Sequence, residues 1–243
     1  MSEPPRKRMV RPPAGGGSGR ALGQRLKAAK SHKASSQAWL ERQLNDPFVA
    51  EAKAKGYRSR AAFKLIELDE RARLIGRGAR VVDLGCPPGG WLQVLSERGA
   101  GRVVGIDLLP VEPAAGVEVL QADFTDPDAQ AALSGRLGGP ADLVLSDMAP
   151  NTTGHRQTDH LRIVGLIEAA ADFAARTLRP GGAFVAKAFQ GGETAAVIAD
   201  LKRRFERVRI LKPKASRAES SEVYLVATGF RGRGQFVRGS RGA

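Results

Sequence analysis

The stretch Val81–Trp91 constrains the fold of this chain more than any other part of the sequence. It opens with VVDL, a run that is apolar except for Asp83 and short enough for a buried strand. The glycines and prolines that follow, GCPPGG, require a tight turn. After Gly90 the apolar residues recur at helical spacing, so a helix leaves the turn. A strand, a glycine turn and a helix are the typical opening of a doubly wound α/β domain, which binds a nucleotide-like ligand at the carboxyl end of its first strand.

The glycine turn also narrows the class of ligand. Its spacing is neither G-x-G-x-x-G nor G-x-x-x-x-G-K-[ST], so it matches neither of the common diphosphate cradles. A ligand without phosphates fits this turn better, and S-adenosylmethionine is the commonest such ligand of the fold. The alternative is a glycine turn without a ligand, because glycine also serves wherever the backbone turns sharply.

Two kinds of segment alternate along the chain. Strands are expected at 80–84, 103–107, 117–120, 142–146, 183–188, 208–211 and 222–228. Helices are expected at 35–55, 59–74, 90–98, 127–137, 158–178 and 192–204. Ser35 and Ser36 would cap the first helix and Ser59 the second. This alternation predicts a mainly parallel sheet with helices on both faces.

Positive charge is concentrated at the two ends of the chain. The formal net charge is +14, yet residues 1–40 contain nine Lys and Arg against Glu3, and residues 231–243 contain four Arg and no acid. We therefore divide the chain into a disordered basic arm (1–33), a folded domain (34–230) and a basic tail (231–243). Such arms favour a polyanionic partner, most simply nucleic acid. Solubilising tails are the alternative, as is an organelle transit peptide at the N-terminus.

Several classes of protein are disfavoured by composition. Cys86 is the only cysteine and the three histidines show no ligand spacing, so neither an internal disulfide nor a metal site is predicted. No apolar run approaches the roughly 18 residues that span a bilayer, and the N-terminus has no apolar signal-peptide core. We expect a cytoplasmic monomer with no membrane partner.

Acidic residues follow three of the expected strands. Asp107 ends VVGID, where an acid in this fold accepts the ribose hydroxyls of an adenosine-type ligand. Asp123 follows the next strand, where a loop can meet the adenine. Asp147 follows LVLS and would lie at the carboxyl edge of the sheet beside the expected methyl donor. Helix caps and turns are the ordinary alternative roles for such acids.

Lys187 interrupts an otherwise apolar strand, AFVAKAF. A lysine in such a place is costly unless it is paired or neutral. Burial and a nearby second cation favour the neutral form of a lysine, which can accept a proton. The alternative is a lysine that extends from the strand end towards water.

Six segments together carry a resemblance to a known family. They are Arg58–Leu65, Asp83–Trp91, Asp107–Pro110, Ser146–Asn151, Lys187–Gly191 and Ser221–Gly229. In this order they resemble the FtsJ/RrmJ (RlmE) family of rRNA ribose 2′-O-methyltransferases over roughly residues 35–230. One departure is Cys86-Pro87, where the family is expected to have two small residues; the turn tolerates proline if no amide is needed there.

The resemblance implies a fold and a set of site residues. The fold is the Rossmann-like S-adenosylmethionine-dependent methyltransferase fold, with a mostly parallel seven-stranded sheet, an antiparallel last strand and helices on both faces. The implied catalytic tetrad is Lys64, Asp147, Lys187 and Glu222. The implied site for S-adenosylmethionine comprises Gly89, Trp91, Asp107, Asp123 and Asp147.

The resemblance also implies a reaction and a substrate. A ribose 2′-oxygen would attack the methyl group in line, with Lys187 as the base, Lys64 and Glu222 holding the ribose, and Asp147 orienting Lys187 and the donor. The implied target is a uridine in the A-loop of large-subunit (23S) rRNA, as rRNA or in the 50S subunit. Alternatives are methylation of tRNA or an mRNA cap, and a non-catalytic RNA-binding ribosome-assembly factor. The complete tetrad argues against the last, and the missing pyrophosphate fingerprint disfavours a nicotinamide dehydrogenase.

Overall fold

The computed structural model describes residues 45–112, 114–150, 156–191 and 194–232. The expected N-terminal arm (1–33) and all but the start of the expected tail (231–243) lie outside these ranges. The described residues from Pro47 onward form one structural unit, and every element described below belongs to it.

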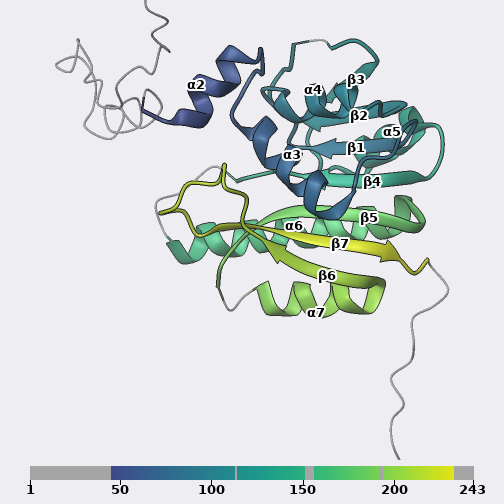
Figure 1. Ribbon diagram of the computed structural model, residues 1–243. Helices are drawn as coiled ribbons and strands as arrows, with labels where there is room; N and C mark the ends of the chain where they lie inside the picture. The colour runs from purple at the N-terminus through teal and green to yellow at the C-terminus, as the bar shows by residue number, and fades with distance from the viewer. Residues whose placement is uncertain (1–44, 113, 151–155, 192–193, 233–243) are drawn as a thin grey trace, which may run out of the picture. The chain divides into compact units, whose positions relative to one another are not determined.

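A single seven-stranded sheet organises the described part of this unit. Its strands are β1 (Arg80–Leu84), β2 (Arg102–Asp107), β3 (Val117–Gln121), β4 (Ala141–Ser146), β5 (Leu178–Phe189), β6 (Phe205–Leu211) and β7 (Glu222–Phe230). The order is β3-β2-β1-β4-β5-β7-β6, which Figure 1 shows from top to bottom. Strands β1 to β5 pair in parallel, whereas β7 is antiparallel to both β5 and β6. The predicted mostly parallel sheet with an antiparallel last strand is confirmed.

Helices cover both faces of the sheet, because strand residues alternate between two apolar clusters. The helices are α2 (Pro47–Ala54), α3 (Ala61–Ala72), α4 (Gly90–Glu97), α5 (Pro127–Leu137), α6 (Arg156–Thr177) and α7 (Thr194–Arg204). Val81 and Val185 pack with α3 and α4. Val82 and Phe184 pack with α5, α6 and α7 on the opposite face. No helix in the part of the chain that the structure describes is long and apolar enough to cross a lipid bilayer.

Two details of the predicted helices are wrong. The helix expected over 35–55 does not run through residues 45 and 46; its described part begins only at Pro47, and proline suits the first turn because that turn needs no amide donor. The predicted cap at Ser35 and Ser36 lies outside the described residues. The predicted Ser59 cap is absent, because α3 begins at Ala61 with Arg60 in helical conformation and no side chain capping it.

The amino end of β5 also differs from the prediction. The strand starts at Leu178, directly after α6, rather than at the expected residue 183. Its pairing with β4 is irregular there, since Ala141 pairs with Leu178 but Leu143 pairs with Ala183. The extra residues between Leu178 and Ala183 form a bulge, which lets β5 resume regular register towards its carboxyl end.

Candidate active site

The directions of three strands bring distant residues to one edge of the sheet. β4 and β5 are parallel, so Asp147, directly after β4, lies at the same edge as Lys187 near the end of β5. β7 runs in the opposite direction, so its first residue, Glu222, lies at this edge too. The register pairs Phe189 with Glu222 and Lys187 with Tyr224. The carboxyl edge therefore collects charged groups from three strands.

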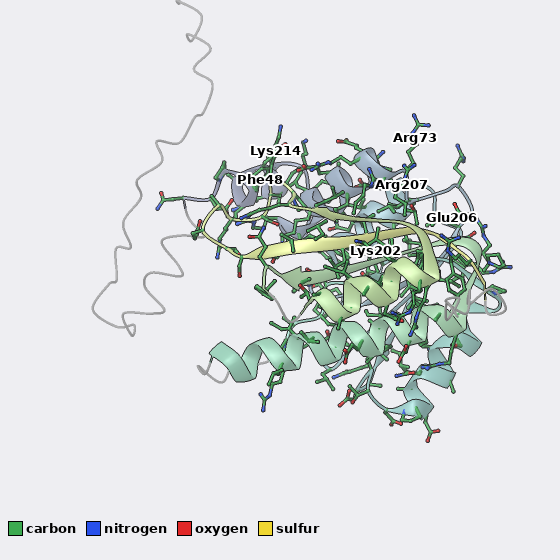
Figure 2. All side chains as sticks on the ribbon, turned by 90° about the horizontal axis from the view of Figure 1, so that it is seen from below. Phe48, Arg73, Lys202, Glu206, Arg207 and Lys214 are labelled. Atoms are coloured by element: carbon green, nitrogen blue, oxygen red, sulfur yellow. The ribbon has the colours of Figure 1, made fainter. Side chains whose placement is uncertain are left out.

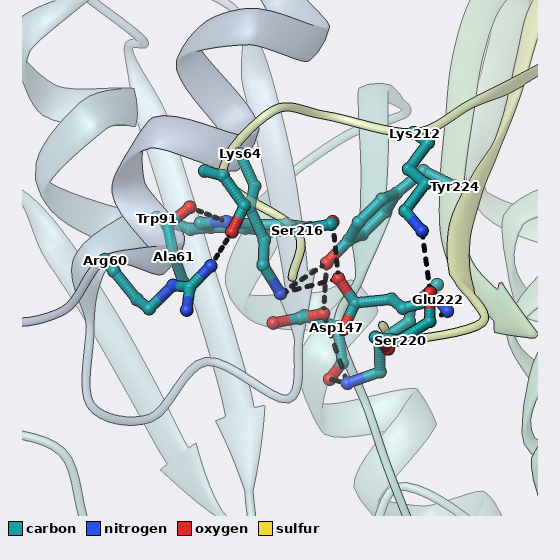
Figure 3. A network of polar contacts seen from close by, with 12 residues as sticks. Arg60, Ala61, Lys64, Trp91, Asp147, Lys212, Ser216, Ser220, Glu222 and Tyr224 are labelled. Atoms are coloured by element: carbon teal, nitrogen blue, oxygen red, sulfur yellow. Dashed lines mark hydrogen bonds and ion pairs between the residues drawn. The ribbon is translucent and has the colours of Figure 1, made fainter. Parts of the chain in front are cut away.

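Helix α3 adds Lys64 to this edge, and the predicted tetrad forms two ion pairs. Lys64 Nζ is 2.8 Å from Glu222 Oε1. Lys187 Nζ is 3.2 Å from Asp147 Oδ1 and donates to the Asp147 carbonyl oxygen at 2.6 Å. The four side chains are only 10–20% exposed. The structure thus brings all four predicted catalytic residues together, partly shielded from water. Figure 3 shows Lys64, Asp147 and Glu222 of this group side by side.

Tyr224 joins the two ion pairs, and the sequence analysis missed it. Its hydroxyl donates to Asp147 Oδ1 at 2.8 Å and accepts from Lys64 Nζ at 3.3 Å. Burial, then the negative charges of Asp147 and Glu222, raise the pKa of Tyr224 well above its ordinary value, so the phenol stays neutral at neutral pH. One sequence signal could have found it: Tyr224 lies two residues after Glu222 on the same strand face, and a buried tyrosine hydroxyl usually needs a partner.

Glu222 is held as a carboxylate by its neighbours. Burial by itself would raise the pKa of Glu222, but the charge and hydrogen bond of Lys64, a hydrogen bond from Ser216 and the charge of Lys187 together lower it. Ser216 Oγ donates to Glu222 Oε1 at 2.8 Å. Glu222 is therefore ionised at neutral pH and balances the positive charge of Lys64.

The loop that carries Ser216, residues 212–221, is tied to α3. The Arg60 guanidinium donates to the Ala215 carbonyl oxygen. The Lys214 amide donates to Glu67 Oε2 at 2.6 Å. Neither Arg60 nor Ser216 was predicted as a site residue, because only the folded loop brings Ala215 to Arg60 and Ser216 to Glu222.

A cavity of about 600 Å³ adjoins the tetrad. Asp107, Asp123, Phe124 and Met148 help to line it, and Met148 directly follows Asp147. One oxygen of Asp107 accepts from the Leu109 amide at 2.8 Å, which leaves the other oxygen of this carboxylate for a ligand hydroxyl. The cavity has the size and the mixture of carboxylates and apolar side chains that an adenosine group requires.

Asp123 lines the same cavity as a carboxylate. Hydrogen bonds from the Thr125 hydroxyl and amide lower the pKa of Asp123, so it is ionised at neutral pH. The structure thus places Asp107 and Asp123 together on the cavity wall, in keeping with the predicted donor site.

The other predicted donor residues, Gly89, Trp91 and Asp147, are not among the described residues that line this cavity. The Trp91 ring is buried, and its indole nitrogen donates to the Ala61 carbonyl oxygen at 2.8 Å, which fastens α4 to α3. Gly89 precedes α4 with φ +102°, and a Cβ there would come within 2.6 Å of the Arg58 guanidinium. Gly89 is thus required by the turn itself, and a contact of Gly89, Trp91 or Asp147 with the donor stays a prediction.

Among the described residues, no group of three or more His, Cys, Asp or Glu side chains is placed to hold a metal ion. The chemistry of the site is that of the two lysines and two carboxylates of the tetrad together with the Tyr224 phenol. Such a set can accept a proton from a hydroxyl group and hold the charges that develop.

Comparison with known proteins decides the family. Residues 57–230 match the family described as FtsJ-like methyltransferase. The chain belongs to this family. The match confirms the resemblance drawn from the six sequence segments. FtsJ-like methyltransferases use S-adenosylmethionine, and the cavity is large enough to hold this ligand.

Individual relatives of this FtsJ-like methyltransferase support the assignment. The chain is 65% identical over 226 residues to the ribosomal RNA large subunit methyltransferase E of Caulobacter sp. (strain K31), covering 93% of this chain and 100% of that protein. It is 65% identical over 215 residues to the protein of the same name from Acidiphilium cryptum (strain JF-5), covering 88% and 96%. The crystal structure of a ribosomal RNA methyltransferase from Plasmodium falciparum superposes with a TM-score of 0.66 at 32% identity, covering 73% of this chain and 100% of that one.

Proposed function

We propose that this FtsJ-like methyltransferase transfers a methyl group to a ribose 2′-oxygen of large-subunit rRNA, at a uridine of the A-loop. The observation that carries the proposal is the pair of linked ion pairs beside the cavity that fits the donor. The names of the similar proteins from Caulobacter and Acidiphilium support large-subunit rRNA as the substrate.

The carboxylates of the cavity position the donor. When bound, S-adenosylmethionine supplies a methyl group on a positively charged sulfur, which is open to attack by an oxygen nucleophile. Asp107 would accept the ribose hydroxyls of the donor through its remaining oxygen, and Asp123 would lie near the base. Met148 lines the cavity and directly follows Asp147. Asp147 and its ion-pair partner Lys187 would therefore lie at the end of the cavity where methyl transfer takes place.

Lys187 is the proposed base. In its neutral form Lys187 Nζ takes the proton of the substrate 2′-hydroxyl while the new carbon–oxygen bond forms and the carbon–sulfur bond breaks. The carboxylate and carbonyl oxygen of Asp147 then stabilise the resulting Lys187 ammonium. Tyr224 donates to Asp147 Oδ1 and so helps to hold the Asp147 carboxylate in place beside Lys187.

Lys64 and Glu222 would position the substrate ribose. Glu222 accepts from both Lys64 and Ser216, so its orientation is held from two sides. Much of the rate would come from this positioning, because an aligned oxygen, methyl group and sulfur need little further ordering to react.

The proposal is tested by mapping 2′-O-methyl groups in the RNA of a strain that lacks this protein. We expect one A-loop methyl group of the large-subunit rRNA to disappear, and to return with the full chain but not with Lys187→Ala. Disappearance of a tRNA or mRNA-cap methyl group instead would refute the proposed substrate. An unchanged methylation map would refute the proposed activity.

A further inference from the structure

A second cleft lies at the opposite edge of the sheet from the tetrad. It has a volume of about 380 Å³, and its wall includes Arg73, Arg77, Arg179 and Thr228. We call it the amino-edge cleft, because it lies where β4 and β5 begin: Asp142 and Ala183 also line it. Lys187 lies four residues after Ala183 on the same strand, which separates the cleft from the proposed base by about 13 Å along the strand.

The strand register extends the cleft towards β6. Ala183 pairs with Thr228 on β7, and Thr228 pairs with Arg207 on β6. Directly paired side chains point to the same face and lie about 5 Å apart at Cβ. Arg207 therefore stands at the rim of the amino-edge cleft.

Positive charge in this cleft exceeds negative charge. Asp142 is the one acid among the described residues that line it, and its partner is Arg179. Burial by itself would raise the pKa of Asp142, but hydrogen bonds from the Arg80 amide and the Arg179 side chain lower it, so the pair is ionised and balanced. Within the described part of the chain, Arg73, Arg77 and Arg207 are exposed and form no ion pair with a carboxylate. Three arginine charges are thus uncompensated at this edge.

Arg73 occupies a backbone conformation that does not favour arginine. It ends α3 with φ 51° and ψ 60°, in the left-handed region where glycine and asparagine are preferred. The cap itself needs only its amide, which donates to the Asp69 carbonyl oxygen. The side chain extends away from the ribbon, as Figure 2 shows, and is available to a ligand.

The floor of the cleft admits a ligand that comes close to the backbone. Gly76 and Gly78 line it, and a Cβ added at either residue would have no atom within 4 Å. Arginine guanidinium groups bind phosphate oxygens through two parallel hydrogen bonds, which makes them the preferred phosphate ligands at such a surface.

We propose that the amino-edge cleft binds backbone phosphates of the RNA substrate at a distance from the methylated ribose. The inference rests on the proposed function in one respect, namely that the substrate is a large folded RNA. Such an RNA extends beyond the reacting nucleotide, and contacts on a second edge fix its orientation without reading its sequence.

The test compares two double variants of the full chain. Arg73→Gln with Arg77→Gln removes two charges from the amino-edge cleft. The matched control, Arg176→Gln with Lys202→Gln, removes two exposed charges from α6 and α7, which pack on the other face of the sheet. Binding of protein-free large-subunit rRNA, prepared from a strain lacking the enzyme, is measured against salt concentration.

We expect the cleft variant to bind this rRNA on the order of tenfold more weakly, because each arginine loses charged hydrogen bonds to phosphate. The slope of log affinity against log salt should fall by about 1.5, for two phosphate contacts. Affinity for S-adenosylmethionine by calorimetry should be unchanged in both variants. The control should keep the affinity and the salt slope of the parent.

Arg73→Asn separates binding from folding. Asparagine tolerates the left-handed conformation, so this variant should melt at the same or a higher temperature than the parent and still lose nearly one from the salt slope. A parent-like affinity and salt slope in both cleft variants would overturn the inference. So would a loss seen only with assembled large subunits and not with protein-free rRNA, because a protein would then occupy the cleft.

Failure of the proposed function would look different. In that case the parent itself would methylate no rRNA, whereas the salt slopes of the cleft and control variants would still report on RNA binding. A parent that methylates rRNA, together with a cleft variant that binds it equally well, would contradict the cleft alone.

Discussion

Removal of one hydroxyl, in Tyr224→Phe, tests whether the two ion pairs of the site act as a unit. Tyr224 is fully buried, and its ring centroid lies 5.9 Å from that of Trp91, a contact that phenylalanine preserves. The substitution deletes the hydrogen bond to Asp147 Oδ1 at 2.8 Å and the longer one from Lys64 Nζ at 3.3 Å. Both are hydrogen bonds to charged groups, so the change isolates the link between the two pairs.

The magnitude follows from what each partner retains. A hydrogen bond to a charged group contributes about 1.5–3 kcal/mol, but Asp147 keeps Lys187 and Lys64 keeps Glu222 after the substitution. The longer bond is the weaker of the two. We therefore expect a loss of about 2 kcal/mol in the free energy of unfolding, which lowers Tm by about 4–8 °C in a domain of this size.

The pH dependence provides a second readout. The pKa of Tyr224 in the folded protein lies well above its ordinary value of 10.0, because of burial and then the charges of Asp147 and Glu222. A group with a raised folded pKa contributes its full stability below the unfolded pKa and loses it as pH rises. The gap in stability between the parent and Tyr224→Phe should therefore be constant from neutral pH to about 10 and shrink above it.

Tyr57→Phe is the matched control. The Tyr57 hydroxyl donates to Glu97 Oε2 at 2.6 Å, but at an exposed position, so we expect a change within about 0.5 kcal/mol. Chemical unfolding followed by fluorescence measures both variants. Equal, small changes in the two variants would refute the linked network.

Four further predictions follow from the site and the sequence. Lys187→Ala and Lys187→Arg should both lose about 10²–10⁴-fold in single-turnover methyl transfer while still binding S-adenosylmethionine, because arginine does not release its proton; a parent-like rate for the arginine variant would make Lys187 a positioning residue. Asp107→Ala should weaken donor binding in calorimetry, and an unchanged affinity would remove Asp107 from the donor site. Asp83→Asn should raise Tm at neutral pH, because burial, then the charges of Asp147 and Asp107, raise the pKa of Asp83. A group with a raised folded pKa stabilises the fold fully only below its unfolded pKa, here 3.8, and this stabilisation declines as pH rises. A difference in Tm between Asp83→Asn and the parent that does not narrow towards pH 4 would contradict this. Deletion of 1–33 and 231–243 should flatten the salt dependence of RNA binding and leave donor binding intact, whereas an unchanged salt slope would show that the arms do not contact RNA.

The periodicity of the sequence was sufficient to predict which helices and strands form, but not all of their ends. Short apolar runs such as VVDL and AFVAKAF predict buried strands, and the helical spacing between such runs predicts the crossover helices of a parallel sheet. Lys187 was predicted as a site residue for a related reason, because a cation inside a buried strand needs a partner. Asp107 and Asp123 were predictable from their places after strands, since the carboxyl ends of parallel strands share one edge.

Tertiary structure alone decided how these residues are connected. Tyr224 belongs to an apolar strand in the sequence, and only the antiparallel register of β7 places its hydroxyl opposite Lys187 and within reach of Asp147. Ser216 reaches Glu222 because its loop is tied to α3, which no local pattern encodes. The amino-edge cleft likewise depends on the bulge in β5 and on side chains from four elements. Spacing along the chain specifies which face a residue occupies, whereas contact between distant segments depends on register and packing, which are properties of the whole fold.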